Sequence, residues 1–165
     1  MRIALAGAGA FGEKHLDGLK LIDGVEITSI ISRTGEQAAE VAAKYGAKHH
    51  STELEDALAR DDVDAVILCT PTQMHAEQAI ACMKAGKHVL TEKLMAHSVH
   101  ECKDMGRVAA QTGKLLATGH QRHYSILYDN AKDTIQRGLL GDLHHVRAQW
   151  HRGNLPGKDS WQQAL

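Results

Sequence analysis

Short apolar runs alternate with segments of helical periodicity along the first 120 residues of the chain. Runs rich in Val, Ile and Leu predict buried strands at residues 3–6, 25–31, 63–69, 88–91 and 115–119. Apolar residues at helical spacing, each series followed by a glycine, predict helices at residues 11–22, 34–45, 73–85 and 98–112. Ser51 and Thr52 precede an acidic turn, so residues 49–58 are expected to hold a short capped helix. The alternation indicates an α/β fold with a doubly wound parallel sheet.

The pattern changes after residue 120. One amphipathic helix is expected at residues 124–138, followed by a turn and a strand at residues 143–151. We therefore predict two domains, a complete one over residues 1–120 and the truncated start of a second, α+β domain over residues 121–165. A single strand leaves an exposed edge and an uncovered apolar face. We expect either a homo-oligomer that forms through residues 121–165 or disorder after about residue 120.

A glycine-rich turn lies between the first predicted strand and the first predicted helix. Its sequence reads Gly7-Ala8-Gly9-Ala10-Phe11-Gly12, the G-x-G-x-x-G spacing of dinucleotide-binding proteins. Gly7 permits the tight turn, Gly9 lets the backbone approach a pyrophosphate, and Gly12 lets the helix pack on the strand. The first amides of the helix then point at the phosphates. We predict cofactor contacts from this turn, Ala10 and Phe11 included; the alternative is a tight turn with a structural role alone.

The end of the second predicted strand bears on which dinucleotide binds. NAD-binding proteins of this kind carry a carboxylate about 20 residues after the glycines, which accepts a hydrogen bond from the ribose. This chain has Ser32, Arg33 and Thr34 there instead. A guanidinium and two hydroxyls suit the 2′-phosphate of NADP, so NADP is predicted and NAD is the second choice. The alternative is that Arg33 is a solvated residue that stacks on adenine.

Charge and cysteine content narrow the function classes. The 165 residues include 19 basic and 20 acidic side chains, so no overall field favours nucleic acid or a membrane surface. The sequence has no apolar run of about 18 residues, and we expect neither a membrane span nor a signal peptide. Three cysteines without CxxC spacing favour a reducing, cytoplasmic location. The 12 histidines show no metal-ligand spacing, so we expect no metal site.

Ligands of doubly wound sheets bind at the carboxyl ends of the strands, where the strand order reverses. In this chain the predicted edge carries residues 7–12, 32–33, 69–72, 92–93 and 119–122. We expect these five segments to line one site.

Several motifs at this edge occur in a fixed order. After the glycine-rich start come Cys69-Thr70-Pro71-Thr72 with His75, then Thr91-Glu92-Lys93, then Gly119-His120-Gln121-Arg122. In this combination the chain resembles the Gfo/Idh/MocA oxidoreductases, which implies a Rossmann NAD(P)-binding domain and a small-molecule substrate. Carried over onto this sequence, the resemblance implies cofactor contacts from Cys69, Thr70, Pro71, Thr72, His75, Glu92, Lys93 and Gln121. Residues 1 to about 89 look most like NADP-dependent members that oxidise the cyclic hemiacetal of an aromatic ring-cleavage product. The remainder looks like generic members, so the implied substrate is a ring-cleavage product or a sugar-like compound.

The resemblance also implies a catalytic residue. The family's Glu-Lys-Pro motif holds a lysine beside the nicotinamide, and Lys93 matches that lysine. A lysine in a dry cleft can take the proton of a hydroxyl that loses hydride, and Glu92 would fix the lysine or the cofactor. Read alone, Glu92-Lys93 is an exposed charge pair. Leu94 stands where the family has proline, so the Lys93–Leu94 bond is either trans, with Lys93 aimed differently, or cis and held by its surroundings.

Family members are longer and carry a glycine-rich segment with an Asp and a His that complete catalysis. This chain ends at Leu165, before any such segment. Three hypotheses follow: an NADP-dependent dehydrogenase, an NADP-binding module without turnover, and a regulatory or oligomerising fragment. The missing segment weighs against efficient turnover by this chain alone.

Overall fold

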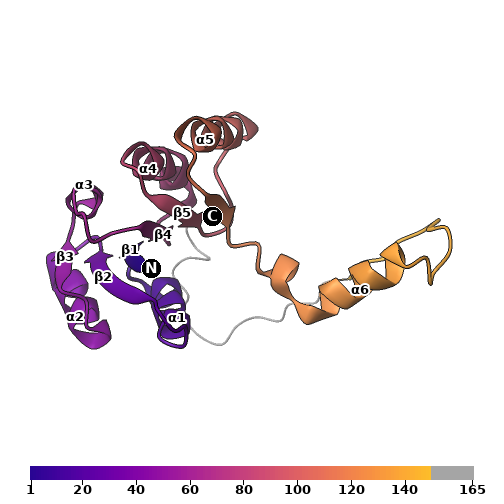
Figure 1. Ribbon diagram of the computed structural model, residues 1–165, viewed down its shortest axis with the longest axis horizontal. Coiled ribbons are helices and arrows are strands. Elements are labelled where there is room, and N and C mark those ends of the chain that lie inside the picture. The colour runs from indigo at the N-terminus through magenta and orange to yellow at the C-terminus, as the bar shows by residue number, and fades with distance from the viewer. Residues whose placement is uncertain (150–165) are drawn as a thin grey trace. The chain divides into compact units, whose positions relative to one another are not determined.

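The computed structural model describes residues 1–149 and shows one parallel sheet with helices on both faces (Figure 1). The strands are β1 (Arg2–Ala6), β2 (Glu26–Ile31), β3 (His49–Ser51), β4 (Ala65–Leu68), β5 (His88–Thr91) and β6 (Leu116–Thr118). The helices of this part are α1 (Ala10–Leu19), α2 (Gly35–Tyr45), α3 (Leu54–Leu58), α4 (Thr72–Lys84) and α5 (Val99–Thr112). The predicted doubly wound parallel sheet is therefore confirmed.

The sheet order is β3-β2-β1-β4-β5-β6. From β1 the chain builds outward through β2 and β3, then returns to the other side of β1 as β4. Strand β4 pairs in parallel with β1, from Ile3 opposite Ala65 to Ala6 opposite Leu68. The order reverses between β1 and β4, and their carboxyl ends are the switch point at which such sheets bind ligands.

Two apolar clusters hold the helices against the sheet. Alternate residues of β1 point to opposite faces, so Ala4 and Ala6 join one cluster while Ile3 and Leu5 join the other. The first cluster takes in buried residues of α4 and α5, and the second takes in buried residues of α1 and α2. The helix pairs lie on opposite faces of the sheet in Figure 1. Small alanines in β1 permit this close packing of helices on strands.

The expectation for residues 49–58 was wrong in part. His49–Ser51 form the third strand, with Ser29 opposite His49 and Ile31 opposite Ser51. Helix α3 starts only at Leu54, and its N-cap residue Glu53 makes no side-chain cap bond. Strand β3 was not predicted, because three polar residues at the edge of a sheet show no apolar pattern. Only its backbone pairing with β2 defines it.

The described residues from Arg122 to 149 belong to a second compact unit. A 3₁₀ turn η1 (Gln121–Tyr124) precedes helix α6 (Ile126–Gln136), which lies within the predicted helix at residues 124–138. The strand predicted at residues 143–151 is absent from residues 143–149, and its last two residues lie outside the described part. A strand needs a partner for its backbone groups, and sequence alternation alone does not supply one.

Candidate functional site

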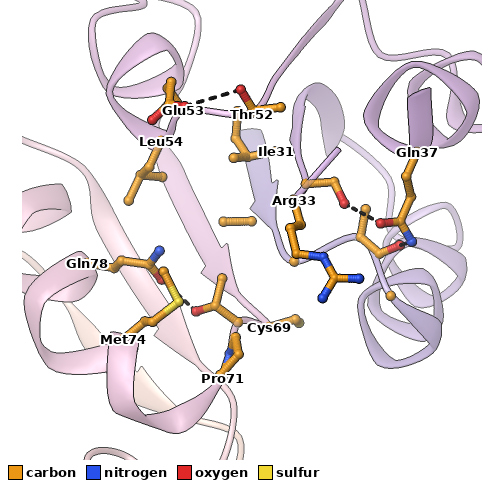
Figure 2. A pocket seen from close by; sticks show the side chains of 16 residues that line it. Ile31, Arg33, Gln37, Thr52, Glu53, Leu54, Cys69, Pro71, Met74 and Gln78 are labelled. Atoms are coloured by element: carbon orange, nitrogen blue, oxygen red, sulfur yellow. Dashed lines mark hydrogen bonds between the residues drawn. The ribbon is translucent and has the colours of Figure 1, made fainter. Parts of the chain in front are cut away.

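A cavity of about 660 Å³ lies at the carboxyl ends of β1, β2 and β4 (Figure 2). Its walls come from the glycine-rich turn, the end of β2, the segment before α3, and the β4–α4 turn with the first turns of α4. The lining residues are Ala6, Gly7, Ala8, Gly9, Ile31, Ser32, Arg33, Gln37, Thr52, Glu53, Leu54, Cys69, Thr70, Pro71, Met74 and Gln78.

Among the three glycines of the glycine-rich turn, only Gly9 has open space at its Cβ position. Gly7 has φ +96°, and a Cβ there would lie 2.5 Å from the Cys69 backbone. A Cβ on Gly12 would lie 2.2 Å from the Gly7 carbonyl oxygen, so helix α1 packs close against the turn. Gly9, in contrast, meets nothing within 4 Å of its Cβ position and faces the cavity. Gly9, the N-cap residue of α1, therefore borders open space directly before the helix, where an anion site would lie.

The end of β2 supplies the polar wall. Ser32 is buried, and its hydroxyl donates to Gln37 Oε1 at 2.6 Å, while Gln37 Nε2 donates to the Ala8 carbonyl at 3.1 Å. Gln37 thus ties the glycine-rich turn to β2. Arg33 is exposed at the cavity, on the side opposite Met74 and Gln78 (Figure 2).

The β4–α4 turn supplies the opposite wall. Thr70 Oγ1 donates to Gln78 Oε1 at 2.5 Å, so its hydroxyl is already engaged. Burial, aided by the negative charge of Glu92, raises the pKa of the Cys69 thiol to about 12. Cys69 is therefore a neutral wall residue at physiological pH, and it lacks the thiolate that a nucleophile needs.

Several residues in the predicted set lie outside this cavity. Thr34 caps helix α2, with its hydroxyl accepting from the Gln37 amide at 3.4 Å. Ala10, Phe11, Gly12 and Thr72 belong to the first turns of α1 and α4 but do not line the cavity, and Gln121 lies exposed in η1. Of the five predicted segments, residues 92–93 and 119–122 contribute nothing to the cavity.

His75 was expected among the cofactor contacts, but the structure places it inside the protein. Its side chain is only 1% exposed. Nε2 lies 2.8 Å from the Thr70 carbonyl oxygen and Nδ1 lies 2.8 Å from the Leu94 carbonyl oxygen. Both ring nitrogens thus lie against backbone carbonyl oxygens, and His75 does not line the cavity.

Glu92 and Lys93 follow β5 at the same edge of the sheet. Glu92 Oε1 lies 2.8 Å from His15 Nε2, and Glu92 Oε2 accepts from the Lys93 amide at 3.1 Å. The Lys93–Leu94 peptide bond is cis, which was one of the two alternatives that the sequence left open. The Lys93 side chain is exposed.

The prediction missed the part of the cavity that comes from β3, α2 and α4. Thr52, Glu53 and Leu54 follow β3, so the strand-end rule would have included them had that strand been recognised. Met74 and Gln78 stand four residues apart and share a face of α4. Glu53 is the notable case, because it brings a carboxylate to a cavity whose β2 end has none.

The described residues hold no group of three or more His, Cys, Asp or Glu arranged for a metal ion. Over residues 1–149, no helix combines the length and the apolar character needed to cross a membrane.

The sheet order, the glycine-rich turn at the strand switch and the cavity beside it define a Rossmann dinucleotide-binding fold. The family model described as "Oxidoreductase family, NAD-binding Rossmann fold" of the Gfo/Idh/MocA group matches residues 1–120. The chain belongs to this oxidoreductase family, as its motifs predicted.

Similar proteins include a 4-carboxy-2-hydroxymuconate-6-semialdehyde dehydrogenase from Sphingobium sp. (strain NBRC 103272 / SYK-6), 64% identical over 140 residues. The alignment covers 85% of this chain and 44% of that protein, so the similarity reaches beyond residue 89. A 1,5-anhydro-D-fructose reductase from Ensifer adhaerens is 31% identical over 140 residues, 85% of this chain and 42% of its own.

Solved structures agree with the fold. A myo-inositol 2-dehydrogenase from Lactobacillus plantarum superposes with a TM-score of 0.79 at 27% identity, over 86% of this chain and 42% of that one. A 3-ketoreductase from Actinomadura kijaniata in complex with TDP-benzene and NADP gives 0.78 at 27% identity, over 86% and 44%. The chain spans less than half the length of the curated relatives it matches.

Proposed function

We propose that the chain is the cofactor-binding part of an NADP-dependent oxidoreductase that acts on a cyclic hydroxyl or hemiacetal. The observation that carries this proposal is the cavity at the β1–β4 switch, which joins the glycine-rich turn to Arg33. The name of the relative at 64% identity, a semialdehyde dehydrogenase, supports a ring-cleavage product as substrate. Three free cysteines support a reducing, cytoplasmic location.

The residues present fit the dinucleotide. Gly9 and the first amides of α1 would hold the pyrophosphate, because the Gly9 Cβ position is open and faces the cavity. Arg33 would pair with the 2′-phosphate, and Ser32, fixed by Gln37, would shape the wall beside it. Glu53 lines the same cavity and carries the opposite charge to Arg33. A carboxylate there can accept hydrogen bonds from ribose hydroxyls, so NAD is the alternative cofactor.

Bound NADP would take the hydride from the substrate carbon. We assign Lys93 as the catalytic residue, whose Nζ accepts the proton from the reacting hydroxyl so that a carbonyl forms. Glu92 fixes the backbone of that lysine through its bond to the Lys93 amide. Residues 121–165 would begin a second domain that completes the substrate site and joins copies of the chain.

Paired titrations with NADPH and NADH test the cofactor assignment. Arg33→Ala should weaken NADPH binding by about tenfold, the size of one charge-assisted contact, and leave NADH binding nearly unchanged. Arg107→Ala is the matched control, because Arg107 pairs with Asp104 on α5 and does not line the cavity. Equal losses for both cofactors would contradict the role of Arg33.

Glu53→Gln is a second test of whether the cavity binds NADP or NAD. Removing a negative charge from the cavity should tighten NADPH binding if the 2′-phosphate lies near Glu53. A loss of NADH affinity with no gain for NADPH would favour NAD as the cofactor instead.

Turnover tests the assignment of Lys93. NADPH formation with a cyclic hemiacetal substrate should disappear in Lys93→Ala while the dissociation constant of NADPH stays within about twofold. Turnover that survives this substitution would exclude Lys93 as the catalytic residue. NADPH binding without turnover in the unmodified chain would favour the NADP-binding module instead.

A further inference from the structure

Two histidines hold the residues on either side of Lys93. His15 contacts Glu92, the residue before it, and His75 contacts Leu94, the residue after it. His15 belongs to α1 and His75 to α4, and these helices pack in the two different apolar clusters on opposite faces of the sheet. The lysine-bearing segment is therefore held from both faces.

The contact from α1 fixes the Glu92 carboxylate. His15 Nε2 lies 2.8 Å from Glu92 Oε1, with the two side chains only 25% and 13% exposed. The other oxygen, Oε2, accepts from the Lys93 amide. A Cβ on Gly119 would lie 3.1 Å from Oε1, so the end of β6 closes the third side. A carboxylate confined in this way orients the peptide that carries Lys93.

His75 of α4 links the segment that carries Lys93 to the wall of the cavity. The His75 ring lies between two carbonyl oxygens, with Nδ1 2.8 Å from that of Leu94 and Nε2 2.8 Å from that of Thr70, and the neutral ring, with one N–H, donates to one of them. Thr70 lines the cavity, and Leu94 directly follows Lys93. The ring therefore contacts both segments, and displacement of either one moves the ring against the other. His75 is almost wholly buried, so water cannot easily take the place of the ring between the two carbonyl groups.

We infer that His15 and His75 are positioning residues that set Lys93 against the nicotinamide end of the bound dinucleotide. His15 stands on α1, the helix whose N-cap residue, Gly9, lines the cavity, so one helix contacts both the proposed pyrophosphate site and the segment that carries Lys93. His75 provides the second anchor through the β4–α4 turn. This inference rests on the proposed function, because it needs a nicotinamide for Lys93 to face.

The test measures binding of the adenosine end and of the nicotinamide end of the cofactor separately. The compound 2′,5′-ADP reports on the adenosine end alone, whereas the fluorescence of bound NADPH reports on its nicotinamide. In His15→Ala and His75→Ala we expect the affinity for 2′,5′-ADP to stay within about twofold of the unmodified chain. The fluorescence of bound NADPH, and kcat where turnover is measured, should fall at least about fivefold, with a smaller change in KM.

A double-mutant cycle with Lys93 shows whether the histidines act through it. If they do, His15→Ala should cost little once Lys93→Ala is present, and the same holds for His75→Ala. His15→Gln should recover part of the signal, because its amide can donate to the Glu92 carboxylate. His100→Gln is the control, since that side chain is 85% exposed on α5. If His75→Ala fails to fold, His75→Gln and the His15 variants complete the test.

Additive losses in the cycle, or a matching loss of 2′,5′-ADP affinity, would overturn the inference, since both mark a general effect on the fold. A chain that binds no NADPH, or a Lys93→Ala variant that alters neither fluorescence nor turnover, would overturn the proposed function instead. The two failures are therefore distinguishable.

Discussion

Asp64 stands beside Arg2, directly before β4 and at the opposite end of the strands from the cavity. Its carboxylate accepts from the Arg2 amide at 2.7 Å and from the guanidinium, with Nη2 at 2.6 Å from Oδ1. The hydrogen bonds from Arg2 hold the pKa of the Asp64 carboxyl well below its usual value of 3.8. This one side chain thus ties together the two strands between which the order reverses. Both side chains are more than a third exposed, so solvent limits the stabilisation.

The lowered pKa predicts a pH-dependent contribution of Asp64 to stability. Because the folded-state pKa lies below the unfolded value of 3.8, the contribution is complete above that pH and is lost as the pH falls toward the folded-state pKa. Asp64→Asn should lower the free energy of unfolding by about 1 kcal/mol at pH 7. Urea unfolding should show this difference shrink below about pH 4. Asp61→Asn is the control on the same loop, and an unchanged gap between pH 7 and pH 3 would argue against the Asp64 ion pair.

Helix α5 illustrates how far local sequence sets an element. Its N-cap is Ser98, whose hydroxyl accepts from the Glu101 amide at 3.1 Å and donates to the Glu101 carboxylate at 3.0 Å. Its C-cap is Gly113, in the left-handed conformation at φ +66°. Both ends were readable from the sequence, because a serine followed three residues later by glutamate, and a terminal glycine, are signals of helix ends.

Removing this N-cap should therefore be measurable. Ser98→Ala leaves the Glu101 amide without its acceptor and should cost about 1 kcal/mol in the free energy of unfolding. Ser125→Ala tests the same substitution at the N-cap of α6, where the side chain makes no cap bond, and we expect less than about 0.5 kcal/mol. Similar effects of the two substitutions in denaturant titrations would show that the cap bond of Ser98 contributes nothing.

At the scale of the whole molecule, the unit that begins at Arg122 exposes much apolar surface. Ile126 and Leu127 of α6 are 77% and 79% exposed, and Leu139 and Val146 are also exposed. Apolar surface of this kind marks a place of association. The sequence predicted self-association through residues 121–165, a range with a predicted strand at residues 143–151, but residues 143–149 form no strand. Because its apolar residues are exposed, helix α6 is the segment through which we expect self-association.

Analytical ultracentrifugation measures the self-association of the chain directly. We expect the chain to sediment as a dimer or larger species at micromolar concentration. Leu127→Glu should shift it toward the monomer, because a charge would be buried without a partner. Leu21→Glu is the control, since Leu21 is 86% exposed in the first unit. A monomer at every concentration would refute self-association through α6.

The elements with strong local signals were predictable within a few residues. The five strands with apolar runs and the helices that end in glycine fall where the pattern placed them, and the glycine-rich turn has the backbone that its spacing indicated. Strand β3 was missed, because three polar residues have no periodicity to read. The site was predictable only where it follows a recognised strand, as at Arg33 and Cys69.

The sequence by itself determined the local backbone: strand, tight turn, helix and helix cap, each set by the conformational preferences of neighbouring residues. Only the tertiary structure decided which distant residues meet. It brought Gln37 to the glycine-rich turn, Glu53 into the cavity and His15 onto Glu92, which is 77 residues away. The physical reason is that such contacts depend on sheet order and register, which the whole set of strands and helices fixes together and no single segment encodes.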